Sequence, residues 1–163
     1  MKTCFFIVMG VSGCGKTTIG SLLARRLGWD FYDADDFHPA ANVAKMAAGI
    51  PLNDDDRAPW LQTLHDLIVQ SLAEHRSGVL ACSALKERYR QTLLAGSSNV
   101  QVVYLKGDFA LIQSRMAARA GHYMKPEMLQ SQFAALEEPV NALVVDIGLS
   151  AEVIVENILT MAV

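Results

Sequence analysis

Eight residues near the N-terminus combine glycines, a lysine and a threonine at a spacing that can do chemistry. The run Gly10-Val11-Ser12-Gly13-Cys14-Gly15-Lys16-Thr17 matches G-x-x-x-x-G-K-[ST] at every defined position. Its glycines let successive backbone N–H groups converge on phosphate oxygens, and a helix that follows adds the positive end of its dipole. We therefore expect a nucleotide-binding loop, in which Lys16 reaches the β- and γ-phosphates and the Thr17 hydroxyl ligates Mg²⁺.

Two further residues of this region need a separate interpretation. Thr18, which caps or packs within the first helical turn, completes the predicted nucleotide-binding set. Cys14 lies near a helix N-terminus, where a thiol pKa can be lowered, and a passive loop residue is the alternative.

A cluster of acids follows the second short apolar run. Asp33, Asp35 and Asp36 come directly after Trp29–Tyr32, so their carboxylates can project beside the phosphates. One carboxylate can hold Mg²⁺, and another can orient an attacking hydroxyl and accept its proton. A solvated acidic turn is the alternative. The chain carries neither the N-K-x-D nor the D-x-x-G motif of GTPases, so adenine is the expected base.

The elements that must position these groups alternate along the chain. Apolar runs predict strands, helical spacing of apolar residues predicts the helices between them, and residues 53–57 are expected to form a polar connection before a long helix begins near Pro59. Asp108 and Ser150 are expected N-caps. This order predicts a three-layer α/β domain over residues 1–163 with a parallel five-stranded sheet. The expected strands are Cys4–Met9, Trp29–Tyr32, Val79–Cys82, Val100–Leu105 and Leu143–Ile147.

Composition excludes several classes of protein. The 163 residues include no apolar run of the ~20 residues that a membrane helix needs, and the net charge of −3 offers no broad basic surface for nucleic acid. Three cysteines form neither a metal-ligand spacing nor a disulfide framework. We expect a cytoplasmic protein with small-molecule substrates and no nucleic-acid or membrane partner. The sequence does not determine the oligomeric state, and a homodimer is one of the states that it allows.

Several segments together resemble the gluconate kinase family of small P-loop kinases. Besides the phosphate loop, the matching segments are Asp33-Ala-Asp-Asp-Phe-His-Pro39, Asn42-Val-Ala-Lys-Met46, Gly49-Ile-Pro-Leu-Asn-Asp-Asp-Asp-Arg57, Pro59-Trp-Leu61, Cys82-Ser-Ala-Leu-Lys86, Tyr89-Arg90, Tyr104-Leu-Lys-Gly107, His122-Tyr-Met124, Ser131-Gln-Phe133 and Leu136-Glu137. The resemblance covers nearly the whole chain, although the family commonly has serine where this chain has Cys14.

The resemblance implies ATP- and Mg²⁺-dependent phosphorylation of D-gluconate on its 6-hydroxyl. It implies Asp35 as the base for the acceptor hydroxyl and Asp33 as a magnesium ligand. The candidate cations for the gluconate carboxylate are Arg57 and Lys86. Weaker substrate-contact candidates, each with a structural alternative, are His38, Lys45 and Arg90.

Arg115 and Arg119 are four residues apart and share one helical face. The family implies adenine contact for Arg115, catalytic phosphate contact for Arg119 and a mobile lid over residues 120–126. Asp146 ends an apolar run like a Walker-B acid, but a structural or nucleotide-rim role is favoured. Two alternatives to a gluconate kinase stay open: a shikimate kinase-like small-acid kinase and a nucleotide-dependent regulatory protein.

Overall fold

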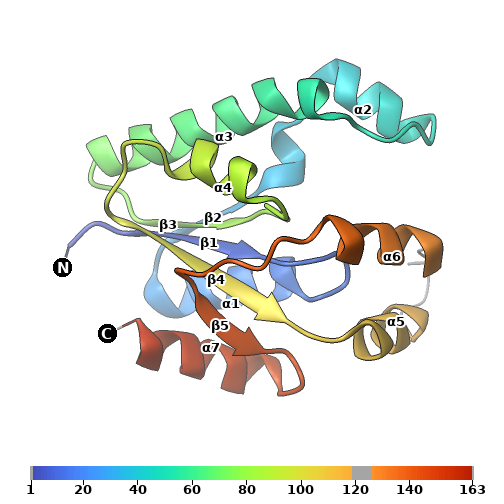
Figure 1. The fold of residues 1–163 in the computed structure, drawn as a ribbon. Helices are drawn as coiled ribbons and strands as arrows, with labels where there is room; N and C mark the ends of the chain where they lie inside the picture. The colour runs from blue at the N-terminus through green and yellow to red at the C-terminus, as the bar shows by residue number, and fades with distance from the viewer. Residues whose placement is uncertain (1, 119–125, 163) are drawn as a thin grey trace.

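A computed structural model describes residues 2–118 and 126–162 of the chain. Five parallel strands form one sheet in the order β2-β3-β1-β4-β5 (Figure 1). The strands are β1 Phe5–Met9, β2 Asp30–Asp33, β3 Gly78–Ala81, β4 Val100–Lys106 and β5 Leu143–Asp146. β1 lies at the centre and is buried along its whole length, as its apolar sequence requires.

Helices cover both faces of the sheet and produce two cores. Helices α1 (Lys16–Leu27) and α7 (Ala151–Met161) pack on one face, and α3 (Asp54–Ala73) and α4 (Glu87–Leu94) pack on the other (Figure 1). Helices α2 (Ala40–Ala47), α5 (Phe109–Ala117) and α6 (Pro126–Ala135), with the 3₁₀ turn η1 (Ala34–Phe37), lie toward the carboxyl ends of the strands. Ligands bind at this edge in open parallel sheets.

The predicted architecture is confirmed. All five strands begin and end within one residue of the expected positions, and their parallel pairing gives the three-layer α/β arrangement. The expected caps also form, because Asp108 accepts a hydrogen bond from the Leu111 N–H at 2.8 Å and Ser150 accepts one from Val153.

The expected polar connection at residues 53–57 is wrong, because α3 already begins at Asp54. Asn53 and Asp56 form a reciprocal capping box, in which each side chain accepts a hydrogen bond from the other residue's backbone N–H. Acids in the first turn add favourable interaction with the helix dipole. Pro59 therefore lies inside the helix rather than at its start.

Helix α6 was not predicted as a separate element. Of the proposed lid, residues 120–125 lie outside the described residues, and Pro126 is the first residue of α6. Within residues 2–118 and 126–162, no helix has the length and apolarity needed to cross a membrane.

Candidate active site

The glycine-rich run forms a tight loop between β1 and α1. Gly13 and Gly15 have φ angles of 81° and 97°, in the left-handed region that favours glycine. A Cβ on Gly13 would also lie 2.6 Å from the Met116 side chain, so the loop packs too closely against α5 for a larger residue. The Lys16 ammonium group donates to the carbonyl oxygens of Gly10 and Val11, both at 3.1 Å, and so lies within the loop.

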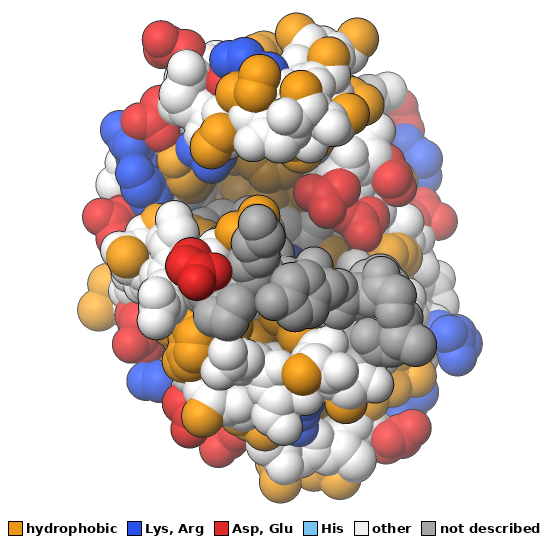
Figure 2. All heavy atoms as spheres, turned by 90° about the vertical axis from the view of Figure 1, so that its right-hand side faces the viewer, with side chains coloured by type: hydrophobic (Ala, Val, Ile, Leu, Met, Phe, Trp, Pro, Cys, Tyr) orange, Lys and Arg blue, Asp and Glu red, His pale blue; other side chains and the backbone are white. Residues whose placement is uncertain are grey.

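A cavity of about 420 Å³ opens beside this loop, which we call the phosphate cavity. The face at the strand ends is visibly hollowed, with acidic side chains beside the hollow (Figure 2). The lining comes from the loop and the start of α1, from the end of β2 and the η1 turn, from the end of β3, and from one residue each of α2 and α6. The lining residues are Ser12, Gly13, Gly15, Lys16, Thr17, Thr18, Asp33, Asp35, Met46, Ala81, Cys82, Ser83 and Gln132.

The end of β2 presents oxygen ligands next to the phosphate loop. Asp33 accepts a hydrogen bond from the Thr17 hydroxyl at 3.1 Å through one carboxylate oxygen and from the Asp35 N–H at 3.0 Å through the other. The second bond caps the η1 turn and fixes the carboxylate. A hydroxyl and a carboxylate at this spacing fit Mg²⁺, which binds hard oxygen ligands and usually one or two protein groups alongside phosphates and water.

Asp35 stands at the open mouth of the phosphate cavity. Partial desolvation, and then the neighbouring Asp33 carboxylate, raise its pKa, although 86% of the side chain is exposed to solvent. The His38 ring is nearby, with Nε2 3.9 Å from an Asp35 carboxylate oxygen. Burial lowers the pKa of His38, which therefore favours the neutral ring.

Trp60 of α3 holds the acidic turn in place. Its indole N–H donates to the Ala34 carbonyl at 2.7 Å, and its ring stacks on His38 at 4.3 Å between centroids. The turn that carries Asp35 is thus fixed to the helix that carries Arg57.

A second cavity of about 210 Å³, which we call the acceptor cavity, is lined by two cations. Arg57 comes from α3, and Lys86 precedes α4. Both lie over the ring of Tyr89, with the Arg57 guanidinium carbon 5.7 Å and the Lys86 ammonium nitrogen 5.9 Å from its centroid. Arg57 donates to the Tyr89 hydroxyl at 3.3 Å, and that hydroxyl donates to Asp54 at 2.6 Å.

The two cavities share two lining residues. Ser83, at the end of β3, and Gln132, on α6, line both of them. The structure therefore brings the predicted phosphate, magnesium and base residues into one cavity and the predicted carboxylate-binding cations into its neighbour.

Three of the predicted substrate contacts line neither cavity, in contrast to Asp35, Arg57 and Lys86: His38, Lys45 and Arg90. Arg90 is buried and donates to the carbonyls of Ala84 at 2.7 Å and Glu137 at 2.6 Å, and to the Glu87 carboxylate at 2.9 Å. The Lys45 ammonium group bonds both carboxylate oxygens of Asp56, at 2.8 and 3.0 Å.

A third cavity, of about 390 Å³, adjoins the outer side of the phosphate loop. Arg115 lines it with apolar residues of α1, α5 and the start of α7, an environment that suits a flat base. Arg119, the other lid-side arginine, lies outside the described residues.

The Cys14 thiol is buried, and burial raises its pKa, in contrast to the lowered pKa that a helix N-terminus can produce. The geometry favours the passive alternative for this residue.

Three residues that hold the site together received no role from the sequence. Tyr89, Trp60 and Gln132 all lay in segments of family resemblance, but their contacts join parts of the chain that are 26 to 120 residues apart. No local spacing signals such partners.

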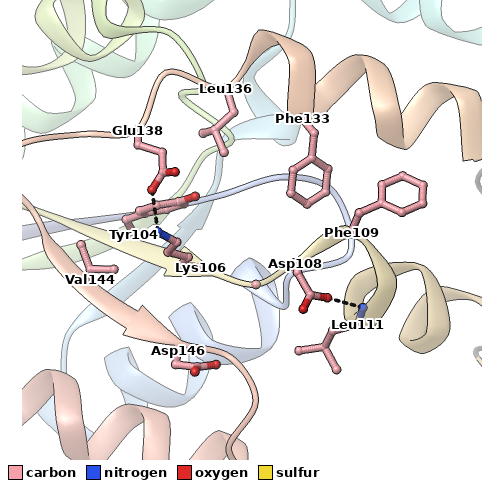
Figure 3. Close-up of a pocket in the computed structure, with 11 residues that line it drawn as sticks. Tyr104, Lys106, Asp108, Phe109, Leu111, Phe133, Leu136, Glu138, Val144 and Asp146 are labelled. Carbon is pink, nitrogen blue, oxygen red and sulfur yellow. Dashed lines mark hydrogen bonds and ion pairs between the residues drawn. The ribbon is translucent and has the colours of Figure 1, made fainter.

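A fourth cavity, of about 690 Å³, lies at the ends of β4 and β5 (Figure 3). Its polar groups bond one another or the backbone: Lys106 pairs with Glu138 at 3.0 Å, and Asp146 accepts a hydrogen bond from the Gly148 N–H at 2.7 Å. Asp146 lines this cavity and not the phosphate cavity. The Asp33 carboxylate, by contrast, lines the phosphate cavity and accepts a hydrogen bond from the Thr17 hydroxyl.

Comparison with known proteins places this chain in a family. A profile of the shikimate kinase family matches residues 12–162. A protein of Rattus norvegicus named "Probable gluconokinase" is 51% identical over 151 residues, which cover 82% of each chain. The crystal structure of a gluconokinase from Sinorhizobium meliloti is 38% identical, with a TM-score of 0.85 over 98% of this chain and 91% of that one.

More distant structures share only the fold. Shikimate kinase from Aquifex aeolicus superposes with a TM-score of 0.60 at 18% identity, over 97% of this chain and 95% of that one. Because the identity to gluconokinases is far higher and extends over most of both chains, the chain belongs to the gluconokinase family of P-loop kinases.

Proposed function

We propose that the protein transfers the γ-phosphoryl group of ATP to the 6-hydroxyl of D-gluconate, with 6-phosphogluconate and ADP as products. One observation carries the proposal: a phosphate cavity built on the G-K-T loop shares the lining residues Ser83 and Gln132 with a smaller cavity lined by Arg57 and Lys86. A polyhydroxy acid needs cations for its carboxylate at one end and a base beside the phosphates at the other. The two neighbouring cavities supply both.

The nucleotide is assigned to the loop side. Backbone N–H groups of the loop and the Lys16 ammonium group would bind the β- and γ-phosphates, and the cavity beside Arg115 would take adenine. Thr17 and Asp33 would hold Mg²⁺, which offsets phosphate charge when it is bound. We keep Arg119 as a phosphate contact and residues 120–126 as a lid in this proposal.

The acceptor is assigned to Asp35 and the two cations. Arg57 and Lys86 would bind the carboxylate of gluconate, which directs the other end of the molecule to the phosphate cavity. Asp35 would orient the 6-hydroxyl and accept its proton as the new P–O bond forms and the bond between the β–γ bridging oxygen and the γ-phosphorus breaks. Its raised pKa makes the carboxylate a stronger base than an ordinary aspartate.

His38, Lys45 and Arg90 receive supporting roles in place of direct substrate contact. His38, beneath Trp60, would keep the acidic turn in position. Arg90 would hold the segment before α4, and Lys45 would hold α2 against α3 through Asp56. We also place the protein in the cytoplasm, which agrees with three unpaired cysteines in the described residues and can be tested by cell fractionation.

ADP release with Mg-ATP tests the proposed function directly. Gluconate, shikimate, glycerate and nucleoside monophosphates should be compared with a reaction that lacks any acceptor, and phosphorus NMR should identify the phosphorylated position. We expect stimulation by gluconate and a 6-phosphate product. Stimulation by shikimate alone would favour the shikimate kinase alternative, and acceptor-independent turnover coupled to a partner protein would favour a regulatory role.

A further inference from the structure

Gln132 of α6 makes a paired contact with the phosphate loop. Its side-chain oxygen accepts a hydrogen bond from the Ser12 backbone N–H at 2.6 Å, and its side-chain nitrogen donates to the Ser12 hydroxyl at 2.8 Å. The amide thus bonds both the backbone N–H and the hydroxyl of Ser12. Gln132 is also one of the two residues that line the phosphate and acceptor cavities together.

The chain just beyond α6 is tied to the other half of the site. The Glu137 N–H donates to the Leu85 carbonyl at 2.8 Å, and the Glu137 carboxylate accepts a hydrogen bond from the Glu87 N–H at 2.8 Å. These partners flank Lys86, one of the two cations of the acceptor cavity. Residues 132–137 therefore connect the phosphate loop at one end with the acceptor side at the other.

We propose that Gln132 is a positioning residue for phosphoryl transfer: its amide holds the phosphate loop in register with the acceptor cavity. The inference rests on the proposed function. Transfer requires the phosphoryl group and the accepting hydroxyl to approach in line, and a misplacement of about 1 Å can cost roughly 10²-fold in rate. A primary amide suits this position because it offers one acceptor and one donor without adding charge beside the phosphates.

The first test replaces Gln132 with leucine, which is similar in size but has no polar group. Gln130→Leu is the matched control, since Gln130 is exposed on the same helix. We expect gluconate-stimulated kcat to fall at least about tenfold in Gln132→Leu, while the Kd of ADP stays within about threefold of wild type. ADP release without gluconate is measured in parallel, and the ratio of stimulated to unstimulated turnover should fall.

Parallel loss of stimulated and unstimulated turnover, in proportion to the folded fraction, would show a merely structural role and overturn the inference. So would a Gln132→Leu variant that matches Gln130→Leu. Wild-type turnover with gluconate is measured first, so a failure of the proposed function is seen separately from a failure of this inference.

Two further variants keep the test decisive if Gln132→Leu does not fold. Gln132→Glu keeps the size and the acceptor but adds a charge near the phosphates, so its kcat should rise relative to wild type as the pH falls and the carboxylate takes a proton. A pH profile identical in shape to that of wild type would contradict the assigned position.

The double variant Ser12→Ala/Gln132→Glu tests whether the two side chains act together. Its loss of activity should be smaller than the sum of the losses, in free energy, of the two single variants. Additive losses would show that the residues act independently.

Discussion

The phosphate loop and the acceptor cavity are built by different means. The loop is a contiguous run whose backbone conformation, set by glycines at φ angles of 81° and 97°, presents the binding groups. The acceptor cavity is assembled from side chains of α3, the segment before α4, and α6. The first half should therefore tolerate changes that preserve its backbone, whereas the second should depend on individual side chains and on the contacts that orient them.

The largest effect is expected at Asp35, which lines the phosphate cavity. Asp35→Asn removes the base but keeps the shape of the side chain, so kcat should fall by about 10²- to 10⁴-fold. The affinity for ATP, measured by equilibrium titration, should change little because the phosphates contact the loop. Asp36→Asn is the matched control, since Asp36 is exposed on the same turn. Equal losses of kcat and ATP affinity would contradict the assignment.

Arg90 and Arg88 of α4 allow a buried arginine to be compared with an exposed one near the acceptor cavity. Arg90→Met removes a buried guanidinium that donates to the carbonyls of Ala84 and Glu137, so the free energy of unfolding should fall by about 2–4 kcal/mol. Arg88→Met, on the same helix, breaks an exposed ion pair with Asp54 and a guanidinium contact with the Tyr89 ring, and should cost less than about 1 kcal/mol. Urea denaturation measures both. If Arg90→Met were as stable as Arg88→Met and only raised the gluconate KM, the original substrate-contact prediction would hold.

Arg57→Met should show the opposite behaviour. Losing a charge-assisted bond to the carboxylate should raise the gluconate KM by roughly 10- to 100-fold while stability and the ATP KM stay near wild type. Steady-state kinetics with each substrate varied in turn measures the split. Arg76→Met, which removes an exposed arginine beyond the end of α3, should leave both KM values unchanged. An equal rise in the ATP KM would place Arg57 in the phosphate half instead.

A smaller effect is expected in the pH dependence. Asp35 acts as a base only when ionised, so kcat/KM for gluconate should be lost as the pH falls through its pKa. Because desolvation and Asp33 raise that pKa in the protein without Mg²⁺, an NMR titration of the metal-free protein should find Asp35 taking up its proton at a higher pH than the ordinary aspartate value of about 3.9. A midpoint at or below that value would contradict the raised pKa.

The contrast between a contiguous loop and a cavity assembled from distant side chains also explains what the sequence could predict of the fold. Buried parallel strands and the loop between β1 and α1 are local patterns, and the structure confirms them. The start of α3 was misjudged because Asn53 and the following acids resemble a polar loop, although their reciprocal cap begins a helix. Pro59, expected at the helix start, is accommodated inside its first turns.

Within the site, the residue types predicted the chemistry. They did not show which charged side chains are already bonded to other groups of the protein. Arg57 and Arg90 are indistinguishable as cations in sequence, yet one lines a cavity and the other is buried against carbonyl oxygens. Gln132 lay in a segment of family resemblance but received no role, because its partner Ser12 lies 120 residues away. Such assignments depend on tertiary contacts, which no local spacing encodes.

The smallest effect is expected inside the loop itself, at Cys14. Its side chain is only 3% exposed and packs against the region of Gly10 instead of facing the phosphate cavity, where the backbone does the binding. Cys14→Ser should keep kcat and the ATP KM within about twofold of wild type, since serine is close to cysteine in size and backbone N–H groups of the loop bind the phosphates. Cys4→Ser, at a partly exposed thiol away from the loop, is the control. A tenfold or greater loss confined to Cys14→Ser would mean that this half of the site also depends on a side chain beyond Lys16 and Thr17, and the contrast between backbone and side-chain construction would fail.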